Sequence, residues 1–142
     1  MDSSDPRLDD ALQAASEARA IAHAPYSGFR MGAAVVTASG AVVRGTLVEN
    51  VSLGLAMCAE RVALFAAVAT QAGRPELLVL HAPTTDGGLT WPCGACLQVA
   101  RELAGPDLLV AVSDGKQVQS ARLHELAPRL PAKRQRGAAA GD

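Results

Sequence analysis

Three cysteines are the residues of this 142-residue chain with the clearest chemical potential. Cys58 stands alone, whereas Cys93 and Cys96 form a C-x-x-C motif. Such a pair can be half of a structural zinc site, a thioredoxin-like redox pair or two ordinary buried thiols. Three thiolates around one zinc ion would leave one coordination position for water, which is the arrangement of a catalytic zinc site. The spacing therefore indicates metal chemistry and leaves the other two interpretations open.

Glu60 lies two residues after Cys58 and could move a proton at such a centre. A carboxylate in the first turn of the same helix could face a water molecule at the metal and act as general base and acid. The simpler interpretation is a glutamate favoured at a helix start by the macrodipole, worth less than ~1 kcal/mol. The histidines, His23, His81 and His124, are more simply interpreted as surface or hydrogen-bonded residues than as a fourth ligand.

The elements that must position these side chains follow from the hydrophobic pattern. It predicts helices at residues 6–23, 58–72 and 93–103, and strands at 33–37, 41–48, 77–80 and 108–112. Both cysteine groups then open a helix, where free N–H groups and the helix dipole stabilise thiolates. Strands alternating with helices predict an α/β fold in three layers, and the initial hairpin makes the central sheet mixed.

Composition narrows the partners that can be expected. Hydrophobic residues make up 49% of the chain and charged residues 19%, which excludes an intrinsically disordered protein. A net charge of −1 provides no broad basic surface, so neither nucleic acid nor a membrane is expected as a partner. A small neutral ligand fits this charge better.

The length of the chain suggests its domain organisation, and its number of cysteines suggests the cellular compartment. We expect one domain over residues 1–130 and a disordered, partly basic tail over 131–142. Three cysteines are too few for a disulfide scaffold, which favours a reducing, cytoplasmic location. No stretch approaches the ~20 apolar residues of a membrane span, and the start lacks a signal-peptide pattern.

Four ordered segments resemble the cytidine deaminases. They are Ala24–Ala34, Glu49–Leu55, Cys58-Ala59-Glu60-Arg61 and Pro92-Cys93-Gly94-Ala95-Cys96-Leu97-Gln98. The resemblance covers about residues 20 to 128. It implies a three-layer α/β/α subunit, usually in a homotetramer with shared active sites. It also implies one zinc ion per subunit and hydrolytic deamination of cytidine and deoxycytidine to uridine and deoxyuridine, with release of ammonia, as in pyrimidine salvage.

The resemblance assigns a role to each matching residue. The zinc ligands would be Cys58, Cys93 and Cys96. Glu60 would carry the proton to the ring nitrogen and then to the leaving amine. The backbone N–H of Ala59 would bind the pyrimidine carbonyl, Phe29 would line the base pocket and Glu49 would bind a ribose hydroxyl. Arg61 would withdraw charge from the sulfur atoms, because three thiolates around a dication sum to −1.

The chain departs from the family pattern around the expected substrate. Leu47 replaces a common Asn that shares the ribose hydroxyl, Leu53 replaces a Tyr and Leu97 replaces an Arg. The usual aromatic residue near the carboxy terminus is missing, and Trp91 is either its stacking substitute or a core residue. These departures leave two alternatives: a deaminase of another aminopyrimidine, such as a modified nucleoside, a free base or a blasticidin-like compound, and a zinc-binding homologue without turnover.

Overall fold

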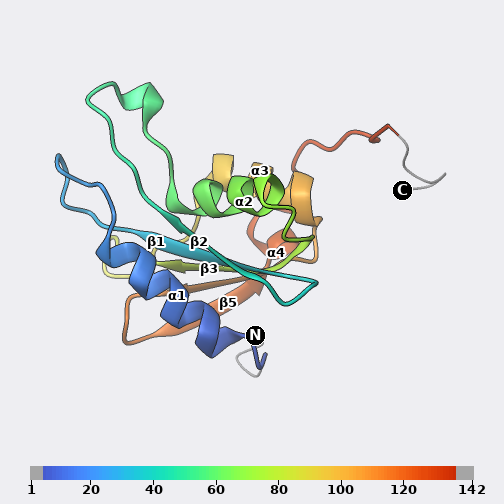
Figure 1. Cartoon of the computed structure of the whole chain (residues 1–142), viewed down its shortest axis with the longest axis horizontal. Helices are drawn as coiled ribbons and strands as arrows, with labels where there is room; N and C mark the ends of the chain where they lie inside the picture. The colour runs from blue at the N-terminus through green and yellow to red at the C-terminus, as the bar shows by residue number, and fades with distance from the viewer. Residues whose placement is uncertain (1–4, 137–142) are drawn as a thin grey trace.

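A computed structural model describes residues 5–136 of the chain. Figure 1 shows a single sheet with helices on both sides. The elements, in chain order, are α1 (Leu8–Ala20), β1 (Gly32–Thr37), β2 (Val42–Thr46), the 3₁₀ helix η1 (Leu53–Leu55), α2 (Ala59–Ala69), β3 (Pro75–His81), α3 (Gly94–Ala104), β4 (Leu109–Ser113), β5 (Val118–Arg122) and α4 (Leu123–Leu126). The strand order is β2-β1-β3-β4-β5.

The sheet is mixed, as the sequence predicts. β1 pairs antiparallel with both β2 and β3, β3 pairs parallel with β4, and β4 pairs antiparallel with β5. Alternate residues of each strand point to opposite faces. On one face Ala34, Val36 and Val79 pack against α1, and on the other Ala33 and Val35 pack against α2 and α3. The expected three-layer α/β/α architecture is therefore confirmed.

The helix predicted at 6–23 is shorter than expected. It runs from Leu8 to Ala20, after a turn in which the carboxylate of Asp5 accepts the backbone N–H of Arg7 at 2.9 Å. The chain leaves the helix before Pro25 because His23 pairs with the segment after β2. Its N–H donates to the carbonyl of Leu47, and its carbonyl accepts the N–H of Glu49. Tertiary pairing thus overrides the local helical pattern.

Two elements near the carboxy terminus were absent from the sequence prediction. β5 carries a single β-branched residue, Val118, and lies at the sheet edge, so its sequence shows little of the strand pattern. α4 has four residues, which is too short for a helical period to be visible. Residues 131–136 belong to neither a helix nor a strand, and the rest of the expected tail, residues 137–142, lies outside the described residues.

Gly45 allows an unusually close approach of β2 to α2. A methyl group at Gly45 would overlap the backbone of Ala59 and lie 2.8 Å from the Cβ of Ala63. Gly32 of β1 makes a similar approach to α1, where a methyl group would overlap Ala15 and Arg19. Each side of the sheet therefore has one glycine that lets a helix pack directly on a strand. The α2 contact matters most, because it fixes the first turn of that helix.

Candidate metal centre and active site

The three cysteines meet where two helices begin. Cys58 immediately precedes α2, Cys93 immediately precedes α3, and Cys96 lies in the first turn of α3. Their sulfur atoms all lie within 4.8 Å of one another, and the Cys93 and Cys96 sulfurs are 3.5 Å apart. A tetrahedral zinc ion with bonds of about 2.3 Å needs sulfur atoms roughly 3.8 Å apart. The cluster thus fits one zinc ion.

No histidine takes part in this cluster. Within residues 5–136, the three cysteines are the only group of three or more potential metal ligands found close together. All three cysteines are free thiols, with Cys96 buried, Cys58 half-buried and Cys93 exposed. A three-sulfur ligand set leaves one tetrahedral position for another ligand, which is the composition of a catalytic rather than a closed structural site.

Arg61 lies directly against the sulfur cluster. Its Nη2 donates a hydrogen bond of 3.3 Å to the sulfur of Cys58. A hydrogen bond from Cys96 and the neighbouring Arg61 guanidinium lower the pKa of Cys58 to about 5. The same interaction with Cys58 raises the pKa of the Cys96 thiol. The protein environment therefore already stabilises thiolate at Cys58, as a metal ligand requires.

Glu60 is buried beside the thiols. It is 1% exposed, and its Oε1 atom is buried without a hydrogen-bond partner among the described residues. Burial, reinforced by the negative charge of Cys58, raises the pKa of Glu60 to about 7. A buried carboxylate oxygen without a partner is costly, so such a group usually serves a ligand or a reaction. The orphaned oxygen and the three thiols together fit a zinc centre with an adjacent proton carrier.

The expected sugar contact, Glu49, is held in a defined position. Its carboxylate accepts the hydroxyl of Ser27 at 2.5 Å and the backbone N–H groups of Tyr26 and Ser27 at 3.1 and 3.3 Å. These hydrogen bonds, led by that from the Ser27 side chain, lower the pKa of Glu49. Ser27 also accepts the backbone N–H of Phe29 at 3.0 Å. The structure thus brings together two of the sequence segments expected to bind substrate.

Trp91 and Phe29 contact the same apolar cluster. Both are half-buried and pack against the group formed by Leu80, Ala82 and Val112. Trp91 also packs against the larger core between the sheet and α2–α3, as does Leu47. Trp91 therefore has a packing role, and it lies two residues before Cys93 in the chain. Substrate contact by either aromatic residue stays a prediction.

Sequence reasoning missed two positioning residues of this site. Ser27 orients Glu49. The sequence feature that could have indicated this role is the position of Ser27 in the turn segment before Phe29. Gly45 allows β2 to reach the turn of α2 that carries Ala59, whose N–H has no helical acceptor at that position. A glycine inside a strand pattern is a general sign of close backbone approach, so this signal was visible in the sequence.

Comparison with known proteins identifies the same zinc-binding region. Residues 6–112 match the family model described as the cytidine and deoxycytidylate deaminase zinc-binding region. A cytidine deaminase of Halalkalibacterium halodurans is 38% identical, over 82% of this chain and 88% of the relative. A cytidine deaminase of Mycobacterium tuberculosis is 42% identical, over 80% of this chain and 81% of the relative.

Solved structures agree with these sequence relatives. The crystal structure of cytidine deaminase from Burkholderia pseudomallei is 41% identical and superposes with a TM-score of 0.78, covering 86% of this chain and 97% of that one. The M. tuberculosis enzyme superposes with a TM-score of 0.75 at 34% identity, covering 91% of this chain and 100% of that one. Both matches therefore cover most of this chain and nearly all of the solved one.

Proposed function

This chain belongs to the cytidine and deoxycytidylate deaminase family, and we propose how its residues carry out zinc-dependent deamination of cytidine and deoxycytidine. The activity replaces the 4-amino group of the pyrimidine by a carbonyl and releases ammonia. The observation that carries this conclusion is the cluster of three sulfur atoms with the buried, unpartnered carboxylate oxygen of Glu60 beside it.

Cys58, Cys93 and Cys96 hold the zinc ion in this proposal. When bound, zinc supplies a Lewis acid that lowers the pKa of water and so generates a nucleophile near neutral pH. The three sulfur ligands lie at the starts of two helices, whose N–H groups and dipoles stabilise thiolates. The helices thus contribute both the ligands and part of the charge compensation.

Glu60 is the proton carrier. Its carboxylate takes one proton from the attacking water and passes it to the ring nitrogen, where that proton stays in the product. It then takes the second proton of the same oxygen, which becomes the new carbonyl, and delivers it to the leaving amine. Burial excludes bulk solvent from this carboxylate, and its free Oε1 can face the reacting atoms. A carboxylate fixed on the same helix as one metal ligand keeps a constant distance to the centre during the reaction.

The remaining contacts orient the nucleoside. The N–H of Ala59, free at the start of α2, binds the pyrimidine carbonyl. Phe29 lines the base pocket, and Glu49 accepts a hydrogen bond from a sugar hydroxyl. Ser27 supports this assignment because it fixes the Glu49 carboxylate and the backbone of Phe29 together. The apolar Leu47 removes one polar group from the sugar side, so it favours substrates that need fewer sugar hydrogen bonds.

We also propose that the chain assembles as a homotetramer with active sites shared between neighbours. Support comes from apolar side chains exposed on the loop before α2 and on α2 itself: Leu53 at 88%, Leu55 at 70%, Phe65 at 46% and Val68 at 58%. Such a set of exposed apolar residues is typical of a protein interface. Sedimentation velocity should give about four times the monomer mass, and a monomeric species would contradict this assembly.

A cytoplasmic location is proposed because the centre needs reduced thiols. Among the described residues, no helix has the length and apolar character needed to cross a bilayer. Oxidation to a disulfide between Cys93 and Cys96 would remove two zinc ligands. Localisation of a tagged chain by fractionation tests this proposal.

Ammonia release from a panel of amines, measured with zinc content on the same sample, tests the function. Cytidine and deoxycytidine should be deaminated by protein that contains about one zinc per chain. The panel should include cytosine, a 3′-deoxy analogue and a blasticidin-like nucleoside. If only one of these three compounds were deaminated, the substrate would be an aminopyrimidine other than cytidine or deoxycytidine. If the protein bound zinc but released ammonia from no amine, it would be a homologue without turnover.

A further inference from the structure

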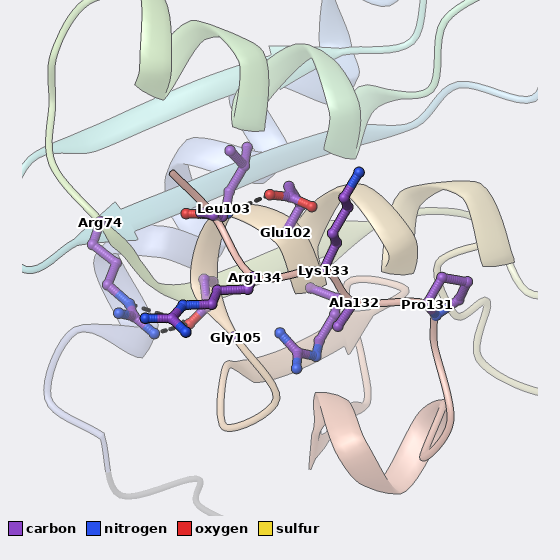
Figure 2. Close-up of a pocket in the computed structure, with 11 residues that line it drawn as sticks. Arg74, Glu102, Leu103, Gly105, Pro131, Ala132, Lys133 and Arg134 are labelled. Atoms are coloured by element: carbon purple, nitrogen blue, oxygen red, sulfur yellow. Dashed lines mark hydrogen bonds between the residues drawn. The ribbon is translucent and has the colours of Figure 1, made fainter. Parts of the chain in front are cut away.

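A cavity lies at the opposite end of α3 from the cysteines. It has a volume of about 630 Å³, and it is lined by the last turn of α3, Arg74 and residues 131–135 (Figure 2). α3 has 11 residues, so its two ends are separated by roughly 15 Å at 1.5 Å per residue. This cavity is therefore separate from the metal centre and has no part in the deamination chemistry.

The walls of this cavity are strongly basic. Four cationic side chains line it, Arg74, Arg101, Lys133 and Arg134, against a single acidic one, Glu102. Within residues 5–136, none of the four cations forms an ion pair with a carboxylate. The chain as a whole has a net charge of −1, so this concentration of positive charge is local. Like charges gathered without counter-charges favour binding of an anion.

Specific contacts build the cavity. The Arg74 guanidinium donates two hydrogen bonds, of 2.6 and 3.2 Å, to the carbonyl of Ala104 at the end of α3. Gly105 lies so close that a methyl group there would be 2.8 Å from Arg74 Nη2. Arg74 and Arg134 project toward the same end of the cavity, next to Gly105, in Figure 2. Arg74 is thus fixed by the main chain while its charge stays available to a ligand.

The segment 131–135 crosses α3 and is held at both ends. The amide of Gln98 donates to the carbonyl of Pro131 at 2.9 Å, and the amide of Gln135 donates to the carboxylate of Glu102. Gln98 and Glu102 are four residues apart, so they lie on one side of the helix. Between the two anchors, the segment places Arg134 beside Arg74, whereas the Lys133 side chain lines the cavity and extends away from that end (Figure 2). The contact with Gln135 also occupies the only carboxylate in the lining.

From this arrangement we infer that the cavity binds a small phosphate-bearing anion with at least two negative charges, a diphosphate or a nucleoside polyphosphate. Guanidinium groups bind phosphate oxygens in bidentate fashion, and three of the four cations are arginines. The volume lies within the range of small-molecule sites and exceeds the need of a single phosphate. No aromatic side chain is among the lining residues, so the base-stacking platform typical of single-stranded RNA binding is missing here.

Calorimetric titration of the full-length, zinc-loaded protein tests this site. The probes are pyrophosphate, inorganic phosphate, ATP and a short oligoribonucleotide, each at two salt concentrations. Pyrophosphate and ATP should bind saturably at about one per chain, at least tenfold more tightly than inorganic phosphate, and more weakly at high salt. Separate Arg134→Gln and Arg101→Gln variants should each weaken pyrophosphate binding several-fold.

Arg44→Gln is the matched control, because it removes one exposed cation from β2, away from the cavity. Its pyrophosphate affinity should equal that of the unmodified protein. Absence of saturable binding would overturn the inference. Equal affinities in the Arg134→Gln variant and the control would do so too, since the anion would then bind elsewhere. If the oligoribonucleotide bound more tightly than pyrophosphate, and if this binding were lost in the same variants, the ligand of the cavity would be RNA and the inference of a small anion would be wrong.

Discussion

Glu60 is a buried carboxylate with one oxygen that has no hydrogen-bond partner among the described residues. Packing alone would favour an apolar residue at such a position, so we assign its presence to proton transfer. Glu60→Gln should keep the zinc ion and the fold and lower kcat by about 10² to 10⁴, the contribution typical of general acid and base catalysis. Steady-state kinetics and zinc analysis on one sample check this.

Glu17→Gln provides the control for Glu60→Gln, because Glu17 is half exposed on α1 and faces the opposite side of the sheet from the centre. Its kcat should match that of the unmodified protein. Near-normal turnover by the Glu60→Gln protein would show that another group moves the proton.

Arg61 contacts the sulfur of Cys58 through a hydrogen bond of 3.3 Å. Because this guanidinium stabilises thiolate, Arg61→Ala should speed the loss of zinc to a chelator several-fold and lower turnover, with a smaller effect for Arg61→Lys. A chelator competition assay measures the first effect. Unchanged zinc release and kinetics in both variants would remove this role from Arg61.

At the residue scale, the clustering of the three cysteines could be predicted because their types and spacing are specific to metal chemistry, while the role of Glu60 stays a prediction. Ser27 could not, because a serine in a turn has many uses, and only the fold brings its hydroxyl to Glu49. Trp91 was left between two interpretations for a similar reason. Its place beside Pro92 in the chain does not reveal that it also packs into the core.

At the scale of elements, the position of α2 depends on the missing side chain of Gly45. Gly45→Ala would push β2 and α2 apart, displacing Cys58 and Glu60 from the ligands on α3. We expect a destabilisation of about 1 to 3 kcal/mol, typical of overpacking, and at least a tenfold loss of zinc affinity. Thermal unfolding and chelator competition measure the two effects.

Gly32→Ala is the matched test, since its methyl group would overlap α1, which carries no residue of the centre. It should lose similar stability and keep its zinc affinity. Equal zinc affinities for the two alanine variants would show that the approach of β2 to α2 supports the fold alone.

The elements around the centre could be predicted because each has a strong period or a continuous apolar run. The predicted helices at 58–72 and 93–103 correspond to α2 and α3, with ends that differ by a few residues. β5 and α4 could not be predicted, because an edge strand with one β-branched residue and a single helical turn depend on tertiary pairing rather than local pattern.

At the scale of the whole molecule, pH should affect stability through His81. This residue lies at the end of β3 and is 7% exposed. Burial and the nearby positive charge of Arg19 lower the pKa of His81, and the negative charge of Asp114 partly opposes this shift. In the unfolded chain the His81 side chain takes up a proton as the pH falls below the ordinary histidine pKa of about 6.5. In the folded chain the same side chain takes up this proton only at a lower pH. This contribution to stability is complete above pH 6.5 and is lost as the pH falls.

Urea unfolding between pH 5 and 8 should therefore give a free energy that falls toward acid. The slope below pH 6.5 should be smaller in His81→Phe, which removes the titrating group, than in His23→Gln, which changes an exposed histidine. Identical slopes in the two variants would assign the acid sensitivity to other groups.

The family match and the fold make the three-sulfur centre the basis of the whole account. X-ray absorption at the zinc edge of the purified protein measures its ligands directly. We predict one zinc per chain with three sulfur neighbours at about 2.3 Å and one lighter oxygen or nitrogen neighbour. A spectrum with four sulfur ligands, or protein that carries no zinc and joins Cys93 to Cys96 in a disulfide, would contradict the account.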